Sequence, residues 1–224
     1  MSMICQPADV RSNVMIPPHI RFYGIDSGIR HSVGGTDYGS VRVAAFMGRR
    51  IIAKESARNA ERNRDPMSAP RRLDPNQFQD FLAKITPSRY DSEILSYLPE
   101  RLVGSVFLSQ YATHGDSVTR IDPDHTYDVR VATKHPIFEN SRVKCFEQLL
   151  RSPASEDQMQ MLGELMYQSH VSYGMCGLGS DGTDKLVELV RQSAQEKKGP
   201  NEGLYGAKIT GGGSGGTVCV LAYT

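Results

Sequence analysis

The sequence predicts an α+β fold in which helices dominate and a few strands lie toward the two ends of the chain. Apolar residues recur at spacings of three and four through much of the 224-residue chain, which is the period of an amphipathic helix. A strand-like run over residues 21–26 stands near the start, and a β-branched run follows residue 216. These patterns predict helices packed on a small, mostly antiparallel sheet, and no internal repeat is visible.

The first predicted elements are a strand and a long helix. The strand over residues 21–26 ends at Ser27-Gly28, and a loop-like stretch over residues 33–37 follows it. From Tyr38 onward the apolar residues share one helical face. This pattern predicts a helix that begins near Tyr38 and fades near Ser56.

The middle of the chain predicts a linker followed by several helices. Residues 58–76 are polar and rich in proline and asparagine, which indicates a surface insertion or linker. A helix is predicted to open at Ser155, because Glu156 and Asp157 then fall in its first turn, where carboxylates suit the helix dipole. The remaining predicted elements are short helices over 76–85 and 88–98, a turn over 122–127, helices over 139–150, 155 to about 173 and 184–194, and strands over 203–210 and 217–223.

Composition and charge exclude several classes of function. The net charge of +1 gives no global field toward nucleic acid or a membrane, and the arginines of residues 58–76 have no interleaved aromatics. The four cysteines are scattered and form no CxxC pair, and the six histidines show no metal-ligand spacing, so we expect no metal site. No secretory signal or 20-residue apolar stretch is present. We therefore expect a cytoplasmic protein with neither a nucleic-acid nor a membrane partner.

The most prominent motif is the glycine loop, which we define as residues 211–216 with the sequence GGGSGG. It spells GxGxxG, but a β-branched run follows it instead of the helix that a Rossmann fingerprint requires. It is not a Walker A loop either, because Gly212 stands where lysine is needed. Because glycines allow positive φ and close approach of another group, we expect several of these glycines to have positive φ. A plain hairpin loop, a phosphate-proximal loop and a domain-contact loop all remain open.

A second GxGxxG pattern occupies residues 177–182. It precedes a predicted helix, but it also follows one, so the strand that a dinucleotide-binding unit needs is absent. The favoured interpretation is a turn between two helices, with Asp181 or Thr183 near the helix N-cap.

Two segments at opposite ends of the chain resemble one kinase family. Residues 24–33, GIDSGIRHSV, followed by YGSVR over 38–42, look like the galactokinase-type strand, "HS" loop, tyrosine and arginine-bearing helix. Residues 205–216, YGAKITGGGSGG, resemble the third conserved motif of the GHMP kinases, the family of galacto-, homoserine, mevalonate and phosphomevalonate kinases. Between them, residues 122–127, 142–144 and 177–184 are similar to segments of the L-arabinokinase branch, both in their order and in their residues.

This resemblance implies the C-terminal part of a two-lobed kinase that phosphorylates a monosaccharide at its anomeric hydroxyl with ATP and Mg²⁺. It divides the chain into the end of an N-terminal lobe with a connecting helix (1–55), the polar insertion (56–76) and a GHMP-type C-terminal domain (77–224). Tyr38 matches the family's sugar-contacting tyrosine, although a packing role is the alternative. The third-motif glycines, which in the family lie beside the phosphate loop, are Gly211, Gly212, Gly213, Gly215 and Gly216.

The family's first two motifs and its sugar-facing aspartate precede the matching segment, and neither PxGxGLSSS nor a GxMDQ-like aspartate occurs here. The resemblance thus supplies no catalytic residue and no metal ligand for this chain. It implies a missing N-terminal lobe, in the same polypeptide or a partner chain, and a fragment that is inactive alone. Without that lobe, we expect the glycine loop to be exposed to solvent. The alternative is a kinase-derived binding or regulatory module without catalysis.

Overall fold

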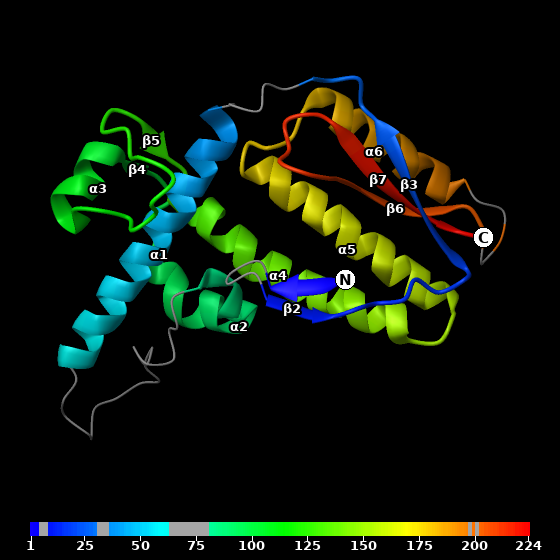
Figure 1. Cartoon of the computed structure of the whole chain (residues 1–224), viewed down its shortest axis with the longest axis horizontal. Coiled ribbons are helices and arrows are strands. Elements are labelled where there is room, and N and C mark those ends of the chain that lie inside the picture. Colours follow the sequence, from blue (N-terminus) through cyan, green and yellow to red (C-terminus); the bar gives the residue numbers. More distant parts are fainter. Residues whose placement is uncertain (5–8, 31–35, 63–80, 197–198, 200–201) are drawn as a thin grey trace. The chain divides into compact units, whose positions relative to one another are not determined.

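The structure is a computed structural model that describes the chain except for residues 5–8, 31–35, 63–80, 197–198 and 200–201 (Figure 1). The described residues form two compact units. Unit 1 comprises residues 1–4, 8–38 and 142–224, and unit 2 comprises residues 5–7 and 39–141. The predicted boundaries at residues 55 and 76 divide the chain into parts of a longer kinase, and they stay a prediction.

Unit 1 is built on a three-stranded antiparallel sheet with the order β3-β7-β6. Strands β3 (Ile20–Asp26) and β7 (Thr217–Tyr223) pair along their whole lengths, and β6 (Leu204–Ile209) pairs with the other edge of β7. A small antiparallel hairpin, β1 (Ser2–Ile4) with β2 (Asp9–Ser12), is a separate sheet. The central strand of the main sheet thus lies near the end of the chain, whereas one of its partners lies near the start.

Two helices of unit 1 pack on this sheet: α5 (Glu156–Met175) and α6 (Asp181–Gln195) (Figure 1). Alternate side chains of β7 enter two apolar clusters. Leu221 packs with Met159 and Leu162 of α5, whereas Val218 and Val220 pack with apolar residues of α6. Both faces of β7 are therefore covered, which explains why its sequence is apolar without clear alternation.

Both helices begin at a serine that satisfies free backbone donors. The Ser155 hydroxyl accepts a hydrogen bond from the Gln158 backbone N–H at the start of α5. At the start of α6, Ser180 and Thr183 form a capping box, in which each side chain accepts from the other residue's backbone N–H. The predicted turn between two helices is therefore confirmed, with Ser180 as the N-cap.

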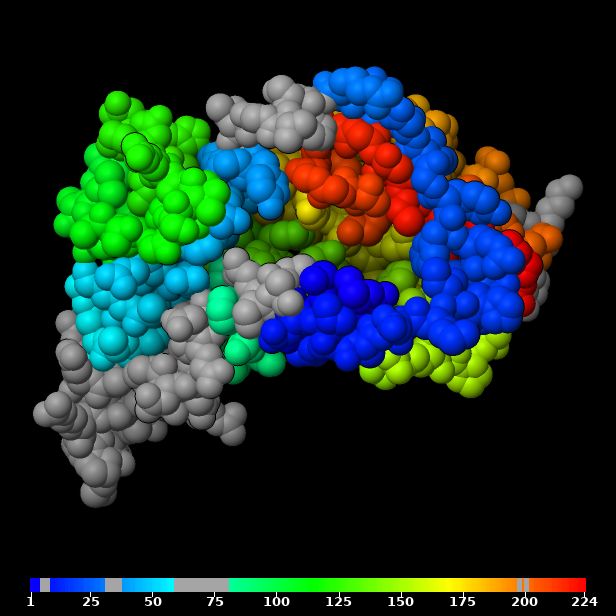
Figure 2. Space-filling model, viewed as in Figure 1, coloured from blue at the N-terminus to red at the C-terminus, as the bar shows by residue number. Residues whose placement is uncertain are grey.

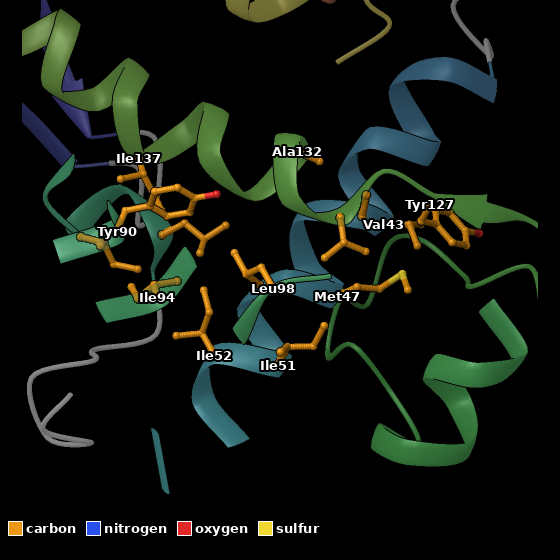
Figure 3. Close-up of a cluster of buried hydrophobic side chains, with 14 of the residues drawn as sticks. Val43, Met47, Ile51, Ile52, Tyr90, Ile94, Leu98, Tyr127, Ala132 and Ile137 are labelled. Carbon is orange, nitrogen blue, oxygen red and sulfur yellow. The ribbon is translucent and has the colours of Figure 1, made fainter. Parts of the chain in front are cut away.

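Unit 2 is organised around one apolar cluster, drawn in Figure 3. Its largest helices are α1 (Thr36–Arg62), from Gly39 onward, and the first part of α4 (Val129–Arg151), up to Ser141. These helices approach closely, since a Cβ built on Gly48 would lie 1.7 Å from Thr133 Oγ1. The smaller elements are the 3₁₀ turn Leu82–Lys84, α2 (Pro87–Arg89), the π turn Tyr90–Ile94, the 3₁₀ turn Leu95–Tyr97, α3 (Gly104–Tyr111) and the pair β4 (Leu102–Val103) with β5 (Thr126–Tyr127).

A partly buried charged pair also stabilises unit 2. Arg42 Nε and an Arg42 terminal nitrogen donate to the two oxygens of Asp116, at 2.7 and 2.9 Å, and Thr119 Oγ1 donates to Asp116 at 2.6 Å. The Asp116 side chain is 3% exposed. The guanidinium of Arg42 holds the Asp116 pKa well below its usual value. The neighbouring His114 is also buried and accepts the Asp116 backbone N–H through Nδ1.

The predicted α+β class is confirmed, and the strands and helices of unit 1 lie close to their predicted places. Several predictions for unit 2 are wrong in extent. α1 continues to Arg62, beyond the predicted end near Ser56, and α4 begins at Val129, ten residues before the predicted Glu139. The start of α4 was missed because Pro136 lies inside it and its first turns are rich in β-branched residues. Helix α3 and the β1–β2 and β4–β5 pairs were not predicted, and most of the 58–76 stretch lies outside the described residues.

Candidate functional site: the glycine loop

The glycine loop joins β6 to β7, as a hairpin prediction requires. Four of its five glycines have positive φ: Gly211, Gly213, Gly215 and Gly216. Ser214 also adopts a left-handed φ of 58°. The prediction that several glycines have positive φ is therefore confirmed. Residues with a Cβ rarely adopt this conformation, so the backbone path of the loop explains why it contains so many glycines.

The inner side of the loop packs against two other segments of unit 1. The backbone N–H of Ser214 donates to the Leu178 carbonyl at 2.7 Å, and the N–H of Gly216 donates to the Ile29 carbonyl at 3.1 Å. A Cβ on Gly213 would lie 2.5 Å from the Leu178 carbonyl oxygen, and one on Gly215 would lie 2.8 Å from that of Ile29. These two glycines are therefore required by close packing within the chain itself.

This packing corrects one expectation. The loop was expected to be solvent-exposed in the absence of a second lobe, but Gly213 and Gly215 are buried. The segments around Ile29 and Leu178 hold them in place. The residues around Leu178 belong to the second GxGxxG pattern, so that turn supports the glycine loop as well as joining α5 to α6.

The outer side of the loop is open. Gly211 and Gly212 are exposed, and a Cβ built on either residue, or on Gly216, would meet no heavy atom within 4 Å. In the space-filling view, the orange and red atoms of β6, β7 and their connection reach the surface beside the blue atoms of β3 (Figure 2). The loop therefore has a fixed inner side and an outer side that another backbone or a ligand can approach.

The C-terminal part of α5 also contacts the loop and the strand that leads into it. The Tyr173 hydroxyl donates to the Gly211 carbonyl at 3.2 Å. The Ile209 backbone N–H donates to His170 Nδ1 at 3.4 Å, and His170 Nε2 lies 3.2 Å from Asp184 Oδ1. Sequence reasoning missed these supports, because no motif marks a tyrosine and a histidine that are brought to the loop only by the packing of α5 on β6.

Among the described residues, no hydrogen bond or ring contact joins Tyr38 to the glycine loop. Tyr38 lies in the first turn of α1, after β3 and a stretch that includes the undescribed residues 31–35. Its side chain is 54% exposed, so it is not a core packing residue. Its predicted contact with a sugar stays a prediction.

The open side of the glycine loop leaves its backbone accessible to another group. Exposed glycines without Cβ atoms let a phosphate-bearing group approach the backbone closely. The exposed backbone at Gly211 and Gly212 therefore leaves room for a phosphate-bearing group to approach. In the part of the chain that the structure describes, no three His, Cys, Asp or Glu side chains gather in a way that could hold a metal. Over the same residues, no helix is long and apolar enough to cross a membrane.

Comparison with known proteins places these features in a family. No family model matches the chain. The chain is 48% identical to the L-arabinokinase of Arabidopsis thaliana over 232 residues, which cover 99% of this chain and 22% of that protein. Galactokinases match shorter regions: that of Thermosipho africanus is 31% identical over 40% of this chain and 22% of its own length, and that of Thermotoga petrophila is 33% identical over 42% and 24%. The solved Lactococcus lactis galactokinase complexed with galactose gives 16% identity and a TM-score of 0.48, over 94% of this chain and 38% of its own.

The chain thus spans about a fifth of the length of the curated relatives that it matches. Nearly all of it aligns with one of them at high identity, from β1 through the glycine loop to β7. The resemblance stated from the terminal motifs is confirmed by these matches. The chain belongs to the galactokinase and L-arabinokinase branch of the GHMP kinase superfamily and corresponds to a C-terminal portion of such a kinase.

Proposed function

We propose that this chain is the C-terminal lobe of an ATP-dependent monosaccharide-1-kinase of the L-arabinokinase or galactokinase type. The observation that carries the proposal is the 48% identity to an L-arabinokinase across 99% of the chain, whereas only 22% of that kinase is covered. The remaining parts of such a kinase would supply the ATP phosphate loop and the catalytic aspartate. This chain would then contribute one wall of the active site.

The chemistry of phosphoryl transfer supports this division of roles. Such enzymes work chiefly by positioning the reactants and stabilising charge on the transferring group, which requires a phosphate cradle, a metal ion and a residue that orients the nucleophile. The sequence contains no recognised cradle or base, and the described residues contain no metal cluster. ATP and Mg²⁺ would therefore be bound mainly by the N-terminal lobe, and we propose that this chain alone does not catalyse the reaction.

Within this chain we assign two roles. The open side of the glycine loop, at Gly211 and Gly212, would lie against the phosphate-binding loop of the N-terminal lobe, because both residues are exposed and carry no side chain that prevents close approach. Gly213, Gly215 and Gly216 would hold the loop in its shape from the inner side. Tyr38, which is exposed at the start of α1, would contact the sugar.

A reconstitution assay tests the proposal. The chain is purified alone and mixed with a separately expressed N-terminal kinase lobe, and ATP consumption is measured with L-arabinose, galactose and a panel of other monosaccharides. We expect no turnover from either part alone and sugar-dependent turnover from the mixture. Turnover by the chain alone that survives repurification would refute the proposed inactivity. A lobe that binds this chain but yields no turnover with any sugar would favour a regulatory module instead.

A further inference from the structure

The start of the glycine loop is held by two side chains of one helix. Tyr173 lies near the C-terminal end of α5 and donates its hydroxyl proton to the carbonyl of Gly211, the first loop residue. His170, one helical turn earlier, accepts the backbone N–H of Ile209, the last residue of β6. The two bonds lie on either side of Thr210, so α5 holds the point at which the strand becomes the loop.

The hydrogen bonds of His170 define which form of the imidazole suits this site. Nδ1 must carry a lone pair, because it faces the backbone N–H of Ile209. The single ring proton then lies on Nε2, which can donate to Asp184 Oδ1 at 3.2 Å. A protonated ring would carry a second proton on Nδ1, pointed at the Ile209 N–H. Two donors would then face each other, and the bond to the strand would be lost.

The charged groups around His170 divide into two sets. Asp184 on α6 favours the protonated ring, whereas Lys208 on β6 and Arg191 on α6 oppose it. Burial is the largest influence, since only 11% of the His170 side chain is exposed, and it lowers the pKa. The site therefore keeps the ring neutral at neutral pH and loses that state on acidification.

We propose that Tyr173 and His170 are positioning residues for the glycine loop, and that protonation of His170 releases the start of the loop. As a statement about the loop, this stands on the geometry of unit 1 alone. As a statement about catalysis, it rests on the proposed function. If the loop position depends on pH, kinase activity should fall at low pH because the loop is no longer correctly placed, and not because a catalytic group changes its protonation state.

The first test is a pH titration of the 224-residue chain by NMR. Imidazole signals of His170 and backbone amide signals of Ile209, Gly211 and Ser214 are recorded between pH 7.5 and 5. We expect the amide signals to move with the same midpoint as the His170 ring. Loop amides that stay in place while His170 titrates would overturn the proposal.

The variant His170→Gln tests whether protonation of His170, and not another effect of low pH on the chain, changes the loop. Glutamine keeps a hydrogen-bonding side chain but does not titrate, so the pH response of the loop amides should disappear while the chain remains folded. A loop response that persists unchanged in this variant would show that another group causes it, and the proposal for His170 would be wrong.

The role of Tyr173 is tested by Tyr173→Phe, with Tyr23→Phe as the matched control on an exposed face of β3. Amide exchange is measured at Thr210 and Ser214, whose N–H groups are bonded to Thr217 and Leu178. Loss of the Tyr173 bond should speed exchange by about threefold to tenfold, the range expected for one hydrogen bond. Equal exchange in both variants would refute the positioning role.

Kinetics in the reconstituted kinase give an independent readout. Tyr173→Phe should lower kcat and leave the KM for the sugar unchanged. His170→Gln should remove the part of the decrease in activity at low pH that depends on the loop. If reconstitution produces no kinase while the NMR responses occur as expected, the proposed function fails and the positioning of the loop stands. If the kinase works and its loop variants behave as wild type, the positioning proposal fails and the proposed function stands.

Discussion

Gly163 of α5 and Gly206 of β6 lie in direct backbone contact. A Cβ built on Gly206 would be 2.4 Å from the Cα of Gly163, and one built on Gly163 would be 2.0 Å from the carbonyl oxygen of Tyr205. The helix can approach the strand this closely only because neither residue has a side chain. This contact brings the C-terminal part of α5, with His170 and Tyr173, to the start of the glycine loop.

The first prediction concerns this contact. Gly163→Ala should lower the free energy of unfolding by about 2 kcal/mol, because the methyl group must displace backbone atoms of β6. Gly174→Ala in the same helix is the matched control, since no atom lies within 4 Å of its Cβ position. It should be neutral or stabilise by up to about 1 kcal/mol through better helix propensity. Urea unfolding of both variants checks the difference, and equal stabilities would contradict it.

The second prediction separates the two sides of the glycine loop. Gly213→Ala should cost about 2–3 kcal/mol, because residue 213 has a φ of 87° and its Cβ would collide with Leu178. Gly212→Ala should change stability by less than about 0.5 kcal/mol, since the position is exposed and open. Thermal and urea unfolding measure both.

A substitution at Gly212 also tests the proposed contact of the glycine loop with the second lobe. Gly212→Val should also cost this chain little stability, yet sharply reduce turnover in the complete kinase. If the chain instead unfolds while the complete enzyme keeps its rate, the loop has a structural role alone.

The third prediction concerns the Arg42–Asp116 pair of unit 2. Asp116→Asn removes the buried carboxylate of a partly buried, doubly hydrogen-bonded ion pair and should cost about 2–3 kcal/mol. Asp124→Asn, at an exposed turn position of the same unit, should cost less than about 0.5 kcal/mol. Because the Asp116 pKa is lowered in the fold, its contribution is present above pH 4 and is lost as pH falls below that value. A wild-type chain as stable at pH 3 as at pH 6 would contradict this assignment.

The fourth prediction concerns His114. Burial lowers its pKa below the ordinary value of 6.5, so the unfolded chain takes up this proton more readily than the folded chain. Stability from the neutral ring is therefore full above pH 6.5 and decreases as pH falls toward the folded pKa. His114→Asn should reduce the slope of unfolding free energy against pH between 7 and 5. His170 acts in the same direction, so part of the slope should remain, and an unchanged slope in the variant would refute the prediction.

Local signals were sufficient where one element can be recognised without its neighbours. The β-branched run after residue 216 predicted β7 with its observed bounds, and Ser155 with two following carboxylates predicted the start of α5. The glycine count predicted positive φ in the loop, because glycine tolerates this conformation without the steric cost that a Cβ imposes.

The remaining features depend on tertiary contacts that no local pattern encodes. Helix α4 continues through Pro136, because residues on both sides of this proline pack in the apolar core of unit 2. The inner side of the loop is buried on Leu178, 36 positions before Ser214, and on Ile29, 187 positions before Gly216. Local sequence patterns carry no information about contacts at these separations. Tyr173 and His170 were missed for the same reason.

The pairing of β3 with β7 has a consequence for how the protein is made. These two strands bring together distant segments of unit 1. Beside them, the Thr224 hydroxyl donates a hydrogen bond to the carbonyl of Pro18, 206 positions earlier in the sequence. During synthesis, β3 leaves the ribosome about 190 residues before β7 and cannot pair with it until then, which leaves the backbone groups on this side of β3 unpaired for many seconds at usual translation rates. Unit 2 emerges in between with its own core, so it can fold first and shorten the effective loop between β3 and β7. Ribosome-bound chains that stop before β7 should therefore contain a folded unit 2 and a protease-sensitive β3.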